Sequence, residues 1–151
     1  MNKNFLKNYI SDDEMLRISN TIKDCEKYTS GEICISIKNA KPLFRQRKSI
    51  AQLAHKEFYK LGLQNTKEST AVMIFIILKS REFYILADKG IHNKVGNEAW
   101  HGIKDKMQLH FTGGNFAGGL ITGIKEIGRV LKEHFPPGEL NENELPDSIN
   151  Y

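Results

Sequence analysis

The chain contains few of the features that would assign it to a specialised class. Its 151 residues include only two cysteines, Cys25 and Cys34, and no Cys-x-x-Cys pair. A disulfide framework and a cysteine-based zinc site are therefore not expected, and both thiols are interpreted as buried or half-buried. No apolar run approaches the roughly 20 residues that cross a bilayer. The first residues also lack the apolar core of a secretory signal, so we expect a soluble protein.

The chain also lacks the short motifs that mark several enzyme classes. Neither Gly-x-Ser-x-Gly nor His-Glu-x-x-His occurs, and no Ser-His-Asp or Cys-His set can be recognised. The glycine-rich stretch 111–119 lacks the phosphate-loop pattern and follows a helix, so we interpret it as a tight interhelical turn. Aromatic residues lie within apolar runs, which gives no strong nucleic-acid signal. The catalytic residues, if any exist, are therefore unknown at this stage.

Positive charge is missing from the end of the chain. All 22 Lys and Arg lie at or before Lys132, whereas residues 136–151 carry only acids among their charged side chains: Glu139, Glu142, Glu144 and Asp147. We therefore divide the chain into an N-terminal extension (1–10), a folded domain (11–135) and an acidic tail (136–151). The tail is expected to pack on the basic domain, with Leu145 and Ile149 as apolar anchors.

The sequence is organised around an apolar hairpin. Residues 71–78 are almost all apolar and rich in β-branched side chains, which predicts a strand buried on both faces. A polar turn at 79–82 and a second apolar run at 83–87 complete the hairpin. Upstream, the alternation of Ile33, Ile35 and Ile37 with polar or small residues predicts a half-buried strand at 32–38.

Helices are expected around these strands. Ser11 and Glu14 form a capping-box pattern that begins the first helix, and Gly31 follows its end. Three further helices are predicted from apolar residues at helical spacing, and the third helix should begin near Asn93. Their expected buried residues are Ile50, Leu53, Ala54, Phe58 and Leu61; Val95, Ala99, Ile103 and Met107; and Leu120, Ile124, Ile127 and Leu131.

The order of these elements predicts the fold. A strand–helix–strand crossover makes the first two strands parallel, and the hairpin makes the third strand antiparallel to the second. Helices can then cover both faces of a small mixed sheet. We therefore predict an α/β fold, a three-layer α/β/α sandwich with about four helices, and a monomer.

This topology places two carboxylates at one edge of the sheet. Glu32 begins the first strand, and Asp88 follows the third strand, which runs the other way. Carboxylate oxygens suit Ca²⁺ or Mg²⁺, and Glu144 and Asp147 of the tail are candidate further ligands of a weak site. The alternative is structural: Glu32 and Asp88 would cap the following helix or pair with Lys89.

The opposite edge of the sheet is basic. Lys41, Arg45, Arg47 and Lys48 follow the first strand, and Arg81 lies in the hairpin turn. Open α/β sheets tend to bind ligands outside the carboxyl ends of their parallel strands, which is where this edge lies. The five cations are therefore candidates to bind a phosphate group or an anionic surface. A solvated charged loop is the alternative.

Short segments along the chain share a further pattern. They are Thr29-Ser30-Gly31-Glu32-Ile33, Leu61-Gly62-Leu63 with Thr66, Asp88-Lys89-Gly90-Ile91-His92, Trp100, Phe111 with Gly114, Phe116 and Gly119, His134-Phe135-Pro136, and Asn143-Glu144-Leu145-Pro146-Asp147. In this order and spacing they resemble the TPM domain family, named for a thylakoid-lumen protein, a photosystem II repair protein and a modulator of a nematode receptor. The resemblance, to compact soluble bacterial members, runs from about residue 12 to the end.

The resemblance implies an α/β/α sandwich and several activities. Family members are credited with divalent-cation binding, plant members with acid phosphatase activity, and others act as accessory proteins of membrane complexes. Glu32 and Asp88 occupy matching motif positions and are carried over as candidate metal ligands. Ser80 and Asn115 stand where members often carry acids, which would weaken a site that needs those carboxylates.

Three functions follow as hypotheses. The leading one is a Ca²⁺- or Mg²⁺-binding accessory domain without established catalysis, with a membrane-protein complex as the candidate partner. The second is a metal-assisted, acid-phosphatase-like hydrolase of phosphate esters. The third is a basic module that docks on an anionic membrane or nucleic acid. Many family members carry a signal and a membrane anchor that are not seen here, so a cytoplasmic location, peripheral to the membrane where docking occurs, is expected.

Overall fold

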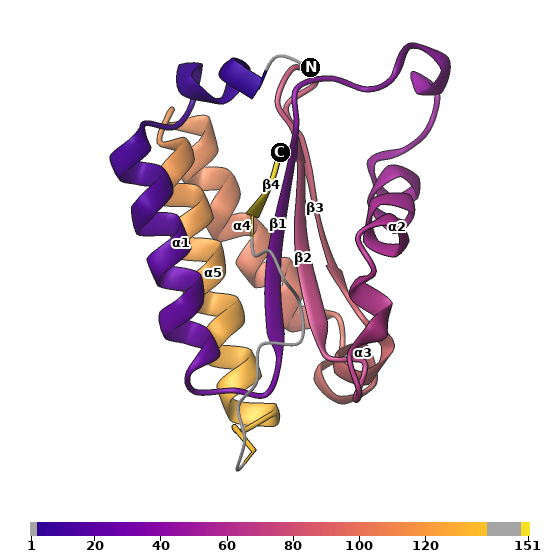
Figure 1. Ribbon diagram of the computed structural model, residues 1–151, viewed down its shortest axis with the longest axis vertical. Helices are drawn as coiled ribbons and strands as arrows, with labels where there is room; N and C mark the ends of the chain where they lie inside the picture. The colour runs from indigo at the N-terminus through magenta and orange to yellow at the C-terminus, as the bar shows by residue number, and fades with distance from the viewer. Residues whose placement is uncertain (1–2, 139–148) are drawn as a thin grey trace.

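The structure, a computed structural model, describes residues 3–138 and 149–151. Figure 1 shows helices on both sides of one twisted sheet. In chain order the elements are η1 Lys3–Asn8, α1 Asp12–Glu26, β1 Glu32–Lys38, η2 Leu43–Arg45, α2 Ile50–Lys60, η3 Leu63–Asn65, β2 Ala71–Ile77, β3 Glu82–Ala87, α3 Lys89–Val95, α4 Glu98–Thr112, α5 Phe116–His134 and β4 Ile149–Asn150.

The sheet has the predicted mixed topology. Its strand order is β3-β2-β1-β4. β1 and β2 pair in parallel with Glu32 opposite Ala71, and β2 and β3 pair antiparallel with Val72 opposite Ala87. The α/β/α sandwich, the parallel crossover and the hairpin are therefore confirmed.

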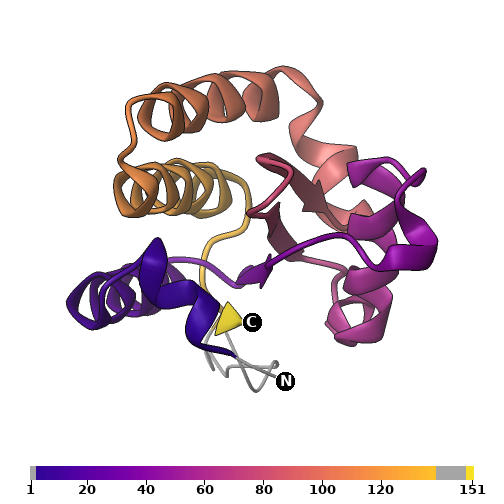
Figure 2. The same ribbon diagram turned by 90° about the horizontal axis from the view of Figure 1, so that it is seen from above.

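The two faces of the sheet carry separate cores. Figure 2 shows α1, α5 and α4 side by side on one face and α2 on the other. Ile33, Ile35 and Ile37 belong to the core on the side of α1, α4 and α5. Cys34 belongs to the core on the other face, together with Leu53 and Phe58 of α2. The first core also includes Leu6 and Ile10 from the predicted N-terminal extension.

β1 is more buried than the alternation of its side chains predicted. Both faces of the strand are covered, and Cys34 and Ser36 are as inaccessible as the isoleucines between them. Ser36 donates a short hydrogen bond to the Glu57 carboxylate of α2, which also pairs with Lys38 at 2.9 Å. The prediction of a half-buried strand was wrong because α2 brings a carboxylate that satisfies the polar groups on this face.

The predicted third helix is two helices. α3 ends at Val95, Gly96 follows with φ 77°, and α4 begins at Glu98. A positive φ interrupts the helical backbone and is accessible to glycine at little cost. The prediction missed this break because apolar residues keep their helical spacing on both sides of it.

The last described residues return to the sheet. β4 pairs in parallel with β1, with Ile149 opposite Ile35, and Ile149 packs against the larger core. Ile149 is one of the two apolar anchors predicted for the tail. The other, Leu145, lies outside the described residues.

Candidate functional site

The structure places Glu32 and Asp88 at the same end of the sheet, on opposite sides of β2. The backbone N–H of Glu32 donates to Thr70 O at 3.0 Å, and that of Asp88 donates to Ala71 O at 2.9 Å. Two strand spacings, about 10 Å, therefore separate their backbones. Topology brings the two residues to one edge, as expected, but β2 lies between them.

Glu32 lies beside a second carboxyl group, that of Glu26. Glu32 is 5% exposed. The N–H groups of successive strand residues point in opposite directions, and that of Glu32 points toward β2. The N–H of Ile33 therefore points away from β2, and it donates to Glu26 Oε2 at 2.9 Å. The carboxyl pair Glu26–Glu32 therefore lies on the side of β1 away from Asp88.

The environment of this pair disfavours two negative charges. Burial raises the pKa of Glu26 to about 8, helped by the hydrogen bond and charge of Glu32 and opposed by the N–H of Ile33. Two carboxyl groups that share a buried site retain a proton between them unless another positive charge replaces it. The pair is therefore a proton site near neutral pH.

Glu26 was missed in the sequence, although a signal existed. It is the last residue of α1, where the helix dipole disfavours a carboxylate. The turn that follows it is fixed: the Thr29 hydroxyl donates to Phe135 O at 2.5 Å and accepts the N–H of Gly31 at 3.0 Å. A Cβ on Gly31 would stand 3.0 Å from a methyl group of Leu131. This packing sets the position of Glu32.

Asp88 begins α3. Its Oδ1 accepts the N–H of Lys89 at 2.8 Å, so the carboxylate caps this helix. Its Oδ2 is buried and has no hydrogen-bond partner among the described residues. Position 90 requires glycine because the loop before β2 passes close to its Cα. A Cβ on Gly90 would stand 2.2 Å from Glu68 O. Capping was one of the roles considered for Asp88, beside metal binding and pairing with Lys89.

The other two metal-ligand candidates belong to the tail. Glu144 and Asp147 lie outside the described residues. Across residues 3–138 and 149–151, no cluster of three or more His, Cys, Asp or Glu side chains is arranged to hold a metal ion. Within that part of the chain, Glu26 and Glu32 supply the carboxyl groups that lie together.

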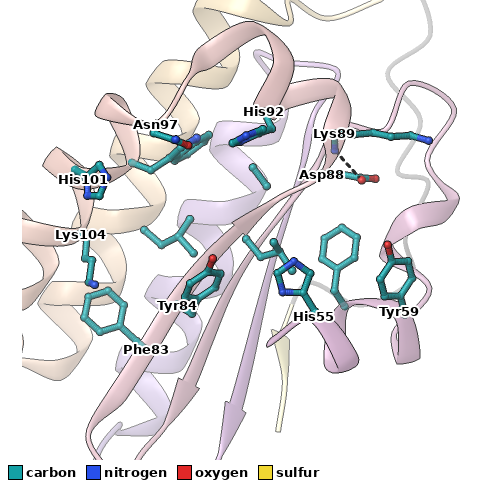
Figure 3. A pocket seen from close by; sticks show the side chains of 15 residues that line it. His55, Tyr59, Phe83, Tyr84, Asp88, Lys89, His92, Asn97, His101 and Lys104 are labelled. Carbon is teal, nitrogen blue, oxygen red and sulfur yellow. Dashed lines mark hydrogen bonds between the residues drawn. The ribbon is translucent and has the colours of Figure 1, made fainter. Parts of the chain in front are cut away.

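A cavity of about 510 Å³ opens beside Asp88. Figure 3 shows it between α2, which contributes His55 and Tyr59, and the start of α4, with Asp88 and Lys89 at one end. Trp100 also lines it, and its Nε1–H is buried without a partner among the described residues. In the sequence, Trp100 is marked only by its place in the family pattern.

The basic edge is partly neutralised. Lys41 pairs with Glu82 at 2.9 Å and donates to Lys48 O at 3.3 Å. Its hydrogen bond is the main cause that lowers the pKa of Glu82. Arg45 lies in η2, Arg47 and Lys48 follow it on the exposed loop, and Arg81 lies in the hairpin turn with φ 55°. The loop between β1 and α2 therefore carries four of the five predicted cations, and one of these, Lys41, is held by Glu82. Arg81 lies in a separate turn.

Two exposed apolar side chains lie on the same loop. Leu43 is 86% exposed and Phe44 is 100% exposed. Their position was not singled out in the sequence because Leu and Phe beside Pro42 look like ordinary core residues. Figure 1 shows this loop, between β1 and α2, projecting from the body of the protein.

These features define a small α/β/α domain with an acidic and a basic end to its sheet. A family model described as the TPM domain matches residues 4–130. The chain belongs to the TPM domain family.

Solved structures agree with this assignment. The NMR structure of the BA42 protein from the psychrophilic bacterium Bizionia argentinensis is 32% identical, covers 94% of each chain and has a TM-score of 0.85. The N-terminal domain of a protein from P. gingivalis is 17% identical, covers 90% of this chain and 83% of that one, and has a TM-score of 0.68. The second likeness concerns the fold alone. A comparison with curated proteins gave no match. No helix in the described ranges is long and apolar enough to span a bilayer.

Proposed function

We propose that this TPM domain binds a divalent cation, Ca²⁺ or Mg²⁺, and serves as an accessory domain of a larger assembly. The observation that carries the proposal is the carboxyl pair Glu26–Glu32, packed together at the start of β1. Hard cations prefer oxygen ligands of this kind, and a bound cation would supply the positive charge that a proton otherwise provides.

The proposed site is centred on β1. Glu26 and Glu32 form its core, and the tail carboxylates Glu144 and Asp147 are proposed as further ligands because the described end of the tail, at β4, runs beside β1. Asp88 lies on the other side of β2, so it is not included in this proposed site. A small number of protein ligands favours weak binding, on the order of 10⁻⁴–10⁻³ M.

The test is a titration with CaCl₂ and with MgCl₂ followed by amide chemical shifts. Shifts are expected near residues 26–33, and Glu32→Gln should weaken binding at least tenfold. Asp24→Asn is the matched control, since its carboxylate is exposed and pairs with Lys27. Binding should also weaken as the pH falls below about 8, because protons then compete for Glu26. Equal affinity of Glu32→Gln and the parent, or shifts confined to other regions, would refute the site.

A second function, docking on an anionic membrane, is favoured by the loop that carries Leu43 and Phe44. An exposed aromatic side chain can enter the acyl boundary while neighbouring cations meet anionic headgroups. Arg45, Arg47 and Lys48 adjoin the two apolar residues in sequence. An apolar tip of this kind suits a lipid surface better than a nucleic-acid backbone.

Sedimentation with lipid vesicles tests this second proposal. The protein should bind vesicles that contain phosphatidylserine more strongly than vesicles of phosphatidylcholine alone, and binding should fall with added salt. Phe44→Ser should reduce binding severalfold. Leu109→Ser is the matched control, because Leu109 is 76% exposed on α4, away from this loop. Equal losses for the two variants, or equal binding to both vesicle types, would exclude insertion of the loop.

A further inference from the structure

The free edge of β3 presents a row of backbone groups. β3 is the terminal strand on its side of the described sheet. Asp88 N–H donates to Ala71 O on β2. In an antiparallel ladder alternate residues face the partner strand. The N–H and C=O groups of Phe83, Ile85 and Ala87 therefore point away from β2.

These groups face the cavity described above. Its lining includes every residue from Phe83 to Asp88. This range covers all of β3 except its first residue, Glu82, and extends one residue past the end of the strand. α2 forms one wall, α4 forms the other, and α3 lies at one end (Figure 3). The cavity is thus a groove with the free edge of β3 along its floor, the β3 groove.

The two walls of the β3 groove differ in chemistry. Phe58 and Tyr59 of α2 give an aromatic wall, and Tyr59 is 62% exposed. His101 and Lys104 of α4 give a polar wall, and Lys89 lies at the end of the groove. Its charged lining is therefore two lysines and Asp88, whose Oδ1 already caps α3. This balance favours an acidic ligand.

Two buried polar atoms in the groove lack partners among the described residues. They are Trp100 Nε1, a donor, and Asp88 Oδ2, an acceptor. Buried polar groups normally find hydrogen-bond partners, and each one left without a partner costs free energy. Both atoms belong to residues that line the groove, and a peptide backbone carries the donors and acceptors that such atoms need.

We propose that the β3 groove binds an extended acidic peptide segment of a partner protein, which adds to the sheet as a further strand beside β3. The outward N–H and C=O groups of the strand would pair with the peptide backbone. Alternate peptide side chains would face the α2 wall, which favours apolar residues, and the α4 wall, which favours acidic ones. This surface is separate from the proposed cation site, which lies on the side of β1 away from β2.

The experiment uses a capped hexapeptide of alternating glutamate and valine as the probe. Trp100 is the only tryptophan of the chain, so its fluorescence reports directly on the groove. We expect a saturable change with this peptide and binding at least tenfold weaker with a peptide of alternating lysine and valine. A peptide of the first sequence, N-methylated on alternate peptide nitrogens, should also bind at least tenfold weaker, because it loses strand-pairing donors.

Protein variants test the wall and the edge. Lys104→Glu should weaken binding of the acidic peptide at least threefold. Lys23→Glu is the control and should leave binding unchanged, because α5 separates α1 from α4. Ala87→Pro removes one outward N–H without touching the ladder with β2 and should also weaken binding. If that variant does not fold, the N-methylated peptide tests the edge on the parent protein.

Several results of these binding experiments would contradict the proposal. Equal binding of the N-methylated and parent peptides would overturn strand addition. Equal binding by Lys104→Glu, or a preference for the lysine peptide, would overturn the acidic partner. Absence of saturable binding of the glutamate–valine peptide would overturn the proposal as a whole.

Discussion

The protonated carboxyl pair at the start of β1 predicts an unusual dependence of stability on pH. The pKa of Glu26 in the folded protein, about 8, lies above its ordinary value of 4.5. The folded state therefore binds more protons than the unfolded state between these two values. The stability that this carboxyl group contributes is fully present below pH 4.5 and is lost as the pH rises through about 8. Glu26→Gln removes this titration, so the variant should gain on the parent as the pH rises.

The size of this gain follows from the shift. At about 1.4 kcal/mol per pKa unit, the shift from 4.5 to about 8 sets an upper limit of about 5 kcal/mol. Glu26 is only partly buried, so we expect a difference of roughly 2–3 kcal/mol in the free energy of unfolding at about pH 8.5 and little difference at about pH 5.

The assay is urea unfolding of the parent and of Glu26→Gln across this pH range. Glu126→Gln is the control, because Lys106 and Arg129 lower the pKa of Glu126 and its titration therefore runs in the opposite direction. Curves of stability against pH that run parallel for Glu26→Gln and the parent would refute the protonated pair. Calcium adds a second readout: if it replaces the proton, it should restore the stability of the parent at high pH and leave that of Glu26→Gln nearly unchanged.

Three further predictions concern the rest of the fold. Phe75 is 3% exposed at the centre of the sheet, and Phe75→Ala should lower the free energy of unfolding by about 3–5 kcal/mol. A loss below about 1 kcal/mol would show that Phe75 is not a core residue. Gly90→Ala should destabilise by roughly 1–3 kcal/mol, because its Cβ would meet Glu68 O, and an unchanged melting temperature would show that the loop yields freely. Lys41→Met should raise the pKa of Glu82 toward its ordinary value in an NMR titration, and the stability that this pair contributes, present at neutral pH, should be lost as the pH falls through the folded pKa of Glu82. An unchanged Glu82 titration would mean that the ion pair does not form in solution.

Much of the fold could be predicted from local patterns. The capping box at Ser11, the alternation in β1 and the apolar hairpin identified α1 and all three long strands, and the handedness of a crossover then gave their directions. The break at Gly96 could not be predicted, because it depends on one backbone angle between two segments that share a helical spacing. The burial of Ser36 depends on Glu57, a residue from another element, which periodicity within one strand does not reveal.

The candidate site was harder to predict for a related reason. Topology correctly brought Glu32 and Asp88 to one edge, because strand direction fixes which ends meet. The partner of each side chain depends on which way the neighbouring N–H groups point, and this is a property of the paired sheet. Thus Glu26 joins Glu32 through the N–H of Ile33, while Asp88 turns to α3. The β3 groove likewise arises only when α2 and α4 are placed on either side of β3.

The pairing of β4 with β1 has a consequence for how the chain reaches its native state. Asn150 contacts Cys34 across 116 residues of sequence, so this side of the sheet is completed long after β1 has been synthesised. Until then the outer edge of β1, an apolar strand with open backbone groups, is available for pairing with another chain. Contacts of such long range also slow folding. A chain shortened to end before Ile149 should therefore aggregate more readily at the same concentration than the full chain, even if its core still forms.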